Sequence, residues 1–423
     1  MASHVLTFWN PEDDAFWKAE GKSIAARNLW ISIPALFLSF AVWMVWSVVV
    51  VNLPALGFTY TTDQLFWLAA IPGLSGATLR IFYSFLVPIF GGRKWTTIST
   101  ASLLVPALGI GFAVQNPFTP FSTMLVLALL CGFGGGNFAS SMANISFFYP
   151  KAQKGTALGL NAGLGNLGVS AVQFIVPLVI LVPLFGGTAR GGVWLQNAGF
   201  VWVPLIALAT IAAWFGMDDI GNAKASFRDQ SVIFRRKHNW IMCWLYLGTF
   251  GSFIGYSAAL PLLIKSQFPD VNAMKFAFLG PLIGALARPV GGWVSDKLGG
   301  APVTFWNFVV MALAAIGVLY FLDGPFPAFL ALFIVLFLAT GVGNASTFRM
   351  IPVIFNAKEA AAILGFTSAI GAYGGFFIPK SFGTSIAMTG GPQAALIGFV
   401  VFYVTCIALT WWYYSRKNAE VPC

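Results

Sequence analysis

Charged residues are scarce in this sequence. They make up 9% of its 423 residues, while 58% of the residues are hydrophobic. A soluble domain carries about 25% charged residues, so this chain cannot cover itself with a water-facing surface. The scarcity excludes a soluble enzyme, a nucleic-acid-binding protein and a secreted scaffold, and it leaves lipid as the surrounding solvent.

Potential metal ligands are also few. The chain has two histidines and four cysteines, and Cys131, Cys243, Cys406 and Cys423 do not have the spacing of a metal site. The first three lie inside apolar runs, so we interpret them as buried small hydrophobic residues and not as disulfide or zinc partners. We therefore expect no metal, no cofactor and no enzymatic active site.

Long apolar segments, by contrast, run through the whole sequence. A membrane-spanning helix needs about 20 apolar residues. Twelve segments meet this need: 28–52, 63–90, 96–115, 119–148, 156–184, 198–217, 239–265, 274–297, 302–322, 325–350, 359–387 and 392–415. We predict an all-α membrane protein with twelve transmembrane helices.

Two polar stretches set the domain limits. Asn10-Pro11-Glu12-Asp13 is typical of a helix N-cap and first turn, which predicts a cytoplasmic amphipathic segment within residues 1–27, lying on the membrane surface. The longest internal polar stretch, residues 218–238, follows the sixth span. We interpret it as a cytoplasmic linker between two six-helix bundles, at 28–217 and 239–423.

The distribution of basic residues predicts the orientation. Twelve spans place both termini on one side, and most of the 23 Lys and Arg residues fall on that side. Only Arg190, Lys265, Lys275 and Lys380 fall on the other side or near the outer ends of spans. This bias follows the positive-inside rule, so we expect cytoplasmic termini, and the net charge of +10 implies no nucleic acid.

The two bundles repeat one sequence pattern. Matching residues keep an offset of 206 to 208 positions: Arg80 with Arg288, Gly91-Gly92 with Gly299-Gly300, Gly136-Asn137 with Gly343-Asn344, and Gly159, Gly165 and Gly168 with Gly365, Gly371 and Gly374. Such a parallel repeat resembles the major facilitator superfamily, whose substrate site lies between the halves near the midplane.

The loops after the two arginines also resemble that superfamily. Ser295-Asp296-Lys297-Leu298-Gly299-Gly300 matches its cytoplasmic loop, and we assign Asp296 to conformational change. The first copy has Gly91-Gly92-Arg93-Lys94 without the aspartate, so the same role is less well supported there.

Arg80 and Arg288 are the candidate substrate-binding residues. Each lies about eleven residues from the cytoplasmic end of its span, about 16 Å deep at about 1.5 Å per residue. A charge at this depth costs at least a few kcal/mol and needs a partner. The thirteen Asp and Glu residues all fall in termini, loops or last turns, so an ion pair within the protein is disfavoured. We expect an anionic substrate to be the counter-ion, clamped between two guanidinium groups.

The lack of acidic residues in the middle of the spans also bears on what drives transport. Carriers driven by protons usually relay them through buried Asp, Glu or His side chains. Neither His4 nor His238 lies in a span. Two unneutralised cations would repel each other when an empty site closed. We therefore expect the carrier to exchange one anion for another, although water or the substrate could also carry a proton.

The fifth and eleventh spans are rich in glycine. We interpret these glycines as packing elements that let helices approach and slide: Gly159, Gly163, Gly165, Gly168, Gly365, Gly371 and Gly374. Asn166 lies among them. A mid-span amide needs a hydrogen-bond partner, which makes Asn166 a candidate binding residue.

Three segments resemble the nitrate/nitrite porter family, and are closest to its NarK-type bacterial members. They begin with Arg27-Asn28-Leu29-Trp30-Ile31-Ser32, with Asn137-Phe138-Ala139-Ser140-Ser141-Met142, and with Gly159-Leu160-Asn161-Ala162-Gly163-Leu164-Gly165-Asn166; a second copy of the last signature runs from Gly365 to Gly375. The resemblance covers nearly the whole chain.

The resemblance implies nitrate and nitrite as substrates, with Arg80 and Arg288 as the anion clamp. By local match, Phe138 and Phe250 would sandwich the planar anion, and Tyr246 and Asn166 would complete its hydrogen bonds. It also implies a multi-pass protein of the bacterial plasma (inner) membrane, surrounded by lipid and expected to be a monomer.

Several alternatives stay open at this point. The family contains both nitrate/nitrite antiporters and proton-coupled nitrate symporters, and the core without carboxylates favours antiport. A clamp of two arginines would also accept formate, chlorate or cyanate. A nutrient sensor on a carrier fold is disfavoured because the polar tails are short.

Overall fold

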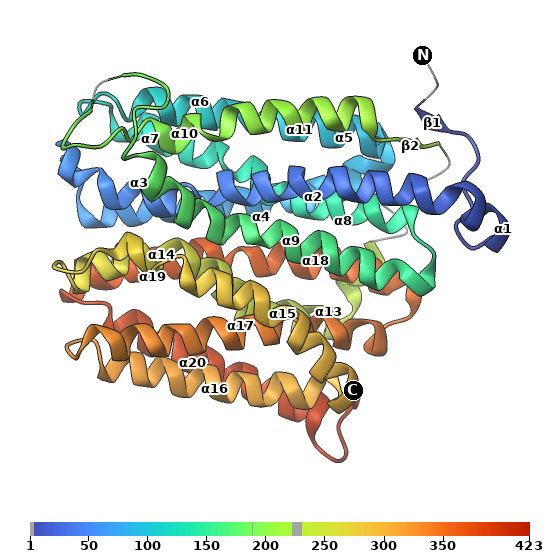
Figure 1. Ribbon diagram of the computed structural model, residues 1–423. Coiled ribbons are helices and arrows are strands. Elements are labelled where there is room, and N and C mark those ends of the chain that lie inside the picture. The colour runs from blue at the N-terminus through green and yellow to red at the C-terminus, as the bar shows by residue number, and fades with distance from the viewer. Residues whose placement is uncertain (1–3, 188, 222–230) are drawn as a thin grey trace.

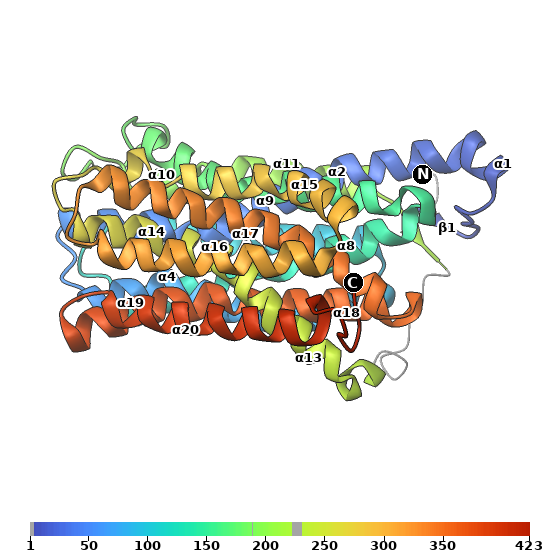
Figure 2. The same cartoon turned by 90° about the horizontal axis from the view of Figure 1, so that it is seen from below.

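Helices form nearly all of the regular structure of this chain. The computed structural model describes residues 4–187, 189–221 and 231–423, with the backbone alone for 84, 231, 357, 358 and 361. Long helices run side by side in two stacked groups, and both ends of the chain lie at the same end of the molecule (Figures 1 and 2). The all-α prediction is confirmed.

The number of membrane-spanning helices is also confirmed. Within the described residues, twelve helical segments are long and apolar enough to cross a membrane. The first bundle contains α2 (Lys22–Met44) with α3 (Trp46–Asn52), α4 (Thr62–Phe90), α5 (Gly92–Ser102) with α6 (Leu104–Ala113), α7 (Phe121–Leu130) with α8 (Gly132–Phe148), α9 (Lys151–Val179), and α10 (Asn197–Phe200) with α11 (Trp202–Gly216). The second contains α13 (Lys237–Tyr246) with α14 (Ser252–Gln267), α15 (Leu279–Leu298), α16 (Gly300–Tyr320), α17 (Phe326–Ile354), α18 (Ala357–Ala372) with α19 (Gly374–Thr389), and α20 (Gln393–Thr410).

The N-terminal helix differs from its prediction. Its N-cap is Asp13, not Asn10, and the Asp13 carboxylate accepts the N–H groups of Ala15 and Phe16. From α1 (Asp14–Phe16) the helix continues through one wide turn into α2, so one continuous helix runs from Asp14 into the first span. The extension is held by packing, because Trp17 is buried in a cluster with the residues that end α8.

The sequence repeat corresponds to a repeat of structure. Gly91 ends α4 with φ 91° and ψ 152°, and Gly299 ends α15 with φ 90° and ψ 149°. A positive φ favours glycine, and in both halves the next helix starts at the following residue. The two halves therefore share this turn as well as their helix order.

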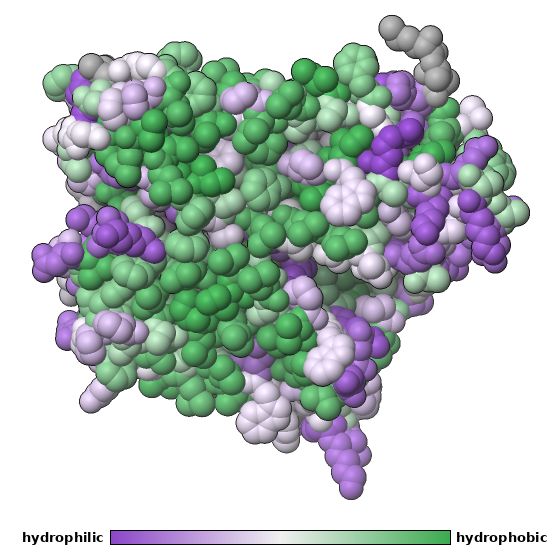
Figure 3. All heavy atoms as spheres, viewed as in Figure 1, coloured by the Kyte–Doolittle hydropathy of each residue, from purple (hydrophilic) through white to green (hydrophobic). Residues whose placement is uncertain are grey.

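The two bundles touch mainly at the end of the molecule away from the termini. There α4 packs on α19, α3 on α14, and α9 on α15. Gln173 of α9 donates to the Ser257 carbonyl of α14 at 2.7 Å, and the rings of Phe174 and Phe278 are 5.1 Å apart. Toward the termini the outline of the molecule is indented between the bundles (Figure 3). The molecule is thus closed at one end and open at the other.

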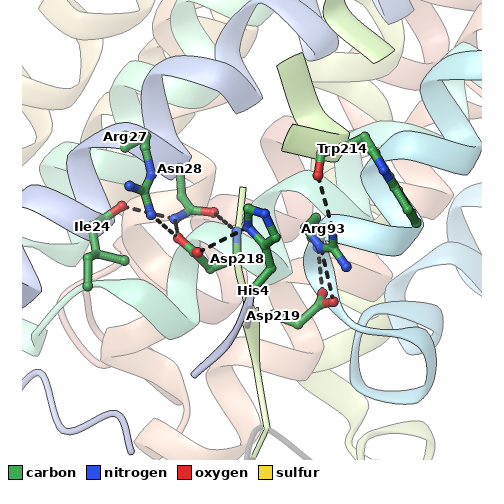
Figure 4. Close-up of polar contacts among 8 residues, drawn as sticks. All are labelled: His4, Ile24, Arg27, Asn28, Arg93, Trp214, Asp218 and Asp219. Atoms are coloured by element: carbon green, nitrogen blue, oxygen red, sulfur yellow. Dashed lines mark hydrogen bonds and ion pairs between the residues drawn. The ribbon is translucent and has the colours of Figure 1, made fainter. Parts of the chain in front are cut away.

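A small polar assembly joins the N-terminal segment to the chain after α11. Strand β1 (Val5–Leu6) pairs in parallel with β2 (Asp219–Ile220). Beside it, Asp218 accepts from Arg27 at 2.6 Å and Asn28 at 2.9 Å, while Asp219 accepts the backbone N–H of Arg93 at 2.8 Å (Figure 4). These contacts tie the first residues of the predicted linker to the first bundle. Residues 222–230 of that linker, with Lys224 and Arg228, lie outside the described residues.

An apolar surface surrounds the helices. On the face that Figure 3 shows, hydrophobic side chains cover the middle of the molecule, and hydrophilic side chains gather toward its ends. Large apolar residues such as Phe112, Leu208 and Leu313 are more than 60% exposed, which would be costly in water. Such a surface fits a multi-pass membrane protein.

Candidate functional site

Arg80 lies in the middle of α4 with none of its surface exposed. Its Nε donates to the Gly135 carbonyl of α8 at 2.9 Å, and its Nη1 donates to the Ser368 carbonyl of α18 at 3.1 Å. Gly135 belongs to the first bundle and Ser368 to the second, so this guanidinium connects the two. Carbonyl groups orient the side chain and leave its charge unneutralised.

Three aromatic rings surround the same guanidinium. Its central carbon lies 4.7 Å from the ring centre of Phe138, 5.2 Å from that of Trp43 and 5.3 Å from that of Phe250. These distances are typical of cation–π attraction. The rings of Phe138 and Phe250 face each other with centroids 6.3 Å apart and planes inclined by 27°. The structure thus brings together three predicted site residues: Arg80, Phe138 and Phe250.

Trp43 is a member of this group that the sequence argument missed. Its indole N–H donates to the Pro72 carbonyl at 2.6 Å, and its ring lies against Gly76 and Gly135, where a Cβ would collide with it. The two glycines therefore admit the ring beside Arg80. A signal existed in the sequence, because Trp43 precedes Phe250 by 207 positions and so occupies the equivalent place in the repeat.

Arg288, the second predicted arginine, lies on α15 and is half-buried. Its Nη2 makes a long hydrogen bond of 3.5 Å to the hydroxyl of Tyr246, and its guanidinium lies 5.7 Å from the ring centre of Phe348. Tyr246 stacks on Phe250 at 5.3 Å and on Phe348 at 4.3 Å. A continuous row of rings therefore links the surroundings of the two arginines. Phe348 is a second residue that the sequence did not identify, and unlike Trp43 it has no aromatic counterpart in the repeat.

A wide helical turn at Leu247–Gly251 positions part of this row. It interrupts the α-helical pattern between α13 and α14 and contains Phe250. Such π-helical turns often occur at functional sites. Tyr246 directly precedes the turn and Phe250 lies within it, and the planes of their two rings are inclined by only 11°.

Both arginines keep hydrogen-bonding capacity. Among the residues that the structure describes, Arg80 Nη2 and Arg288 Nη1 have no hydrogen-bond partner, and no carboxylate forms an ion pair with either side chain. Both groups carry the same positive charge and border the same row of rings, so they repel each other. Buried N–H groups of charged side chains are costly to leave unpaired, so the arrangement is suited to bind an anion.

Asn166 is not joined to this group. It is buried on α9, and its Oδ1 has no hydrogen-bond partner within the described part of the chain. Among the described residues, no hydrogen bond links Asn166 to either arginine or to Tyr246. Its binding role therefore stays a prediction from the resemblance.

The glycines of the fifth and eleventh spans fall into two sets. Gly165, Gly168, Gly371 and Gly374 lie so close to neighbouring helices that a Cβ would collide with Leu36, Phe37, Tyr246 and Gly251, respectively. By contrast, a Cβ on any of three others would meet nothing within 4 Å: Gly159, Gly163 and Gly365. The expected helix contact is not found for this second set, which borders open space toward the end with the termini.

Asp296 and two cations left out of the predicted site form ion pairs. Asp296 accepts from Arg349 Nε at 2.6 Å, which connects the end of α15 to α17 within the second bundle. Lys380 of α19 contacts Asp63 of α4 at 2.8 Å. Arg349 and Lys380 thus each have a carboxylate partner.

Comparison with known proteins agrees with the fold and the repeat. A family model described as the Major Facilitator Superfamily matches residues 35–379. A solved structure of a bacterial homologue of the human lysosomal transporter Spinster, in an inward-facing and unoccupied conformation, superposes with a TM-score of 0.70 over 93% of this chain and 97% of that one. Its sequence identity is 14%, so this likeness concerns the fold alone.

Closer relatives cover the chain from end to end. The nitrate/nitrite transporter NarU of Salmonella typhimurium is 54% identical over 452 aligned positions, covering 99% of this chain and 97% of the relative. NarU of Escherichia coli is 53% identical, covering 98% and 97%. The probable nitrate/nitrite antiporter NarK2 of Thermus thermophilus is 46% identical, covering 99% and 98%.

Proposed function

The chain belongs to the Major Facilitator Superfamily and, within it, to the family of nitrate/nitrite transporters, and from this premise we propose that it is an antiporter that takes up nitrate in exchange for nitrite. In this proposal the anion binds between Arg80 and Arg288, at the interface of the two bundles. Alternating access then carries it across the membrane.

The observation that carries the proposal is the free N–H group on each arginine. Arg80 Nη2 and Arg288 Nη1 lack a partner within the described residues, and no carboxylate competes for them. A small oxyanion between the two groups would accept both and neutralise their repulsion. Guanidinium groups suit planar oxyanions because their N–H groups lie in one plane.

The facing rings of Phe138 and Phe250 support a planar anion. A flat molecule between two rings needs a spacing of about 7 Å, since each contact takes about 3.5 Å. The observed spacing of 6.3 Å is slightly smaller. A small outward movement of Phe250 with the second bundle would admit nitrate or nitrite, whereas a bulkier tetrahedral anion would need a much larger one.

Exchange is favoured over proton coupling by the chemistry of the core. The described carboxylates that form ion pairs lie toward the ends of spans, and Asp218, Asp219 and Glu359 are examples. No such group is placed to relay a proton beside the two arginines. An empty site would have to reorient with two unneutralised cations, while an anion removes that cost.

We place the termini in the cytoplasm, because most Lys and Arg residues lie on that side. In this orientation the open end of the molecule faces the cytoplasm and the closed end faces outward. The state described here would then receive nitrite from the cell or release nitrate into it.

Replacing Arg80 by Lys tests the anion site. We expect transport of nitrate to fall by at least about tenfold, because hydrogen bonds to charged groups contribute about 1.5–3 kcal/mol and Lys cannot replace both the carbonyl contacts and the free N–H. The measurement is nitrate uptake into proteoliposomes that contain equal amounts of folded protein. Arg236→Lys is the matched control, since Arg236 is an exposed partner of Glu359. Full activity of Arg80→Lys would refute the proposed site.

A further inference from the structure

A series of contacts between α4 and the α18–α19 segment runs from the anion site to the closed end. At its inner limit Arg80 of α4 donates to the Ser368 carbonyl. Next, the hydroxyls of Thr78 and Tyr373 are 2.9 Å apart. Because α4 belongs to the first bundle and α18–α19 to the second, each of these contacts joins the two halves.

Farther out, the two helices cross with almost no space between them. A Cβ on Gly73 would collide with the backbone of Gly375, and a Cβ on Gly383 would lie 2.6 Å from the Cβ of Phe66. Trp67 packs on Phe376 with centroids 5.8 Å apart. The crossing is thus sealed by glycines and aromatic rings on both helices.

An ion pair lies at the outer limit of this crossing. Lys380 Nζ contacts Asp63 Oδ1 at 2.8 Å and lies 4.4 Å from the ring centre of Trp67. The side chains of Asp63 and Lys380 are 33% and 24% exposed. Partial burial reduces screening by water, so the pair attracts more strongly than a fully exposed pair would.

This pair differs from the other ion pairs between described residues. Those join residues within one bundle and the chain segments next to it: Arg27–Asp218, Arg93–Asp219 and His4–Asp218 at the first, and Arg236–Glu359, Lys237–Glu420, His238–Glu420 and Arg349–Asp296 at the second. Asp63–Lys380 joins the two bundles. Lys380 also has no charged counterpart in the repeat, because the glycines of the fifth and eleventh spans match at an offset of 206, which pairs Lys380 with Phe174.

We propose that Asp63 and Lys380 form an electrostatic latch that holds the end away from the termini closed. The latch forms only while α4 and α19 are in contact, and it separates when the bundles open at this end. It rests on the proposed function, since an exchanger must open both ends in turn. The latch sets the balance between the two states and does not contact the anion.

The test places a reporter cysteine beneath the latch. Ala70 is fully buried on α4, seven positions after Asp63 and three before Gly73, so it lies near the face that meets α19. The background carries Cys423→Ser, because the other three native cysteines are buried. The rate at which Ala70→Cys reacts with a polar maleimide in detergent solution then reports how often the crossing opens.

Loss of either charge should speed the reaction. We expect Asp63→Asn and Lys380→Met each to raise the labelling rate roughly two- to fivefold, the range typical of a partly exposed ion pair. The charge exchange Asp63→Lys with Lys380→Asp should restore most of the protection. The matched control, Arg236→Gln with Glu359→Gln, removes an ion pair within one bundle and should leave the rate unchanged.

Two results would overturn the latch. One is a labelling rate that neither neutralisation changes; the other is a charge exchange that labels as fast as the single variants. The labelling rate does not depend on which anion is carried. A latch that behaves as expected in a protein that does not exchange nitrate for nitrite would therefore contradict the proposed function alone.

Discussion

At the scale of residues, the two arginines of the repeat have different surroundings. Arg80 is fully buried, with two carbonyl partners and three rings around it. Arg288 is half-buried and has one long hydrogen bond to Tyr246. Matching sequence motifs thus give one guanidinium that is fixed from several directions and one that has fewer and longer contacts, to Tyr246 and Phe348. In the proposed exchange, Arg80 defines the position of the anion and Arg288 closes on it.

Phe250 provides a prediction at the same scale. Its ring is fully buried between Phe138 and Tyr246, so Phe250→Leu keeps an apolar side chain and removes one wall of the planar slot. We expect discrimination of nitrate from chlorate to weaken by about two- to tenfold, since stacked aromatic pairs contribute about 0.5–1.5 kcal/mol. The measurement is inhibition of nitrate uptake by chlorate.

A buried ring away from the site serves as the control for that experiment. Phe333 of α17 is fully buried and packs on Tyr256 and Phe329. Phe333→Leu should cost stability without altering anion discrimination. If Phe250→Leu behaves in the same way, its ring is ordinary packing.

At the scale of elements, the eleventh span contains two glycines whose replacement by alanine should change the stability of the protein in opposite directions. A Cβ on Gly374 would collide with the backbone of Gly251, whereas a Cβ on Gly365 would meet nothing within 4 Å. We expect Gly374→Ala to destabilise the protein by about 1–3 kcal/mol, the usual cost of overpacking. Gly365→Ala should stabilise it by up to about 1 kcal/mol, because alanine favours helix more than glycine does.

Thermal unfolding of the purified variants in detergent measures both effects. A lower midpoint for Gly374→Ala together with an unchanged or higher midpoint for Gly365→Ala is the expected result. Equal midpoints for the two variants would show that the close contact between Gly374 and Gly251 does not contribute to the stability of the protein.

The sequence predicted correctly those features that follow from the order of residues along the chain, such as the length of apolar segments and the spacing of the repeat. Lipid requires about 20 apolar residues per span, so the twelve helices could be counted. A buried charge needs a partner, and the lack of carboxylates in the spans directed attention to Arg80 and Arg288. The conserved spacing of the repeat marked Gly91 and Gly299, which share one backbone conformation.

Contacts between distant segments are harder to predict from the sequence, because they depend on how several helices pack together. Trp43 adjoins Arg80 because Gly76 and Gly135 admit its ring, and this depends on three helices packing together. The pairing of Lys380 with Asp63 joins positions 317 residues apart. The helix of the first span continues back to Asp14 because Trp17 packs in a buried position against the end of α8, and the polarity of the sequence alone does not indicate this.

At the scale of the whole molecule, the closed and open ends describe one state of a carrier with two bundles. The α4–α19 crossing seals the end away from the termini, and the glycines Gly159, Gly163 and Gly365 border open space toward the other end. Transport requires the crossing to separate and the open end to close around the arginines. The proposed exchange follows if this change is costly with two unneutralised guanidinium groups and easy with an anion between them.

Uptake of nitrate into proteoliposomes tests this central claim most directly. Vesicles loaded with nitrite are compared with empty vesicles, at clamped pH and membrane voltage. We predict rapid uptake into loaded vesicles and little into empty ones, because only the anion-bound carrier reorients readily. Equal uptake into empty vesicles, driven by an imposed gradient with acid outside, would contradict the account and indicate proton symport.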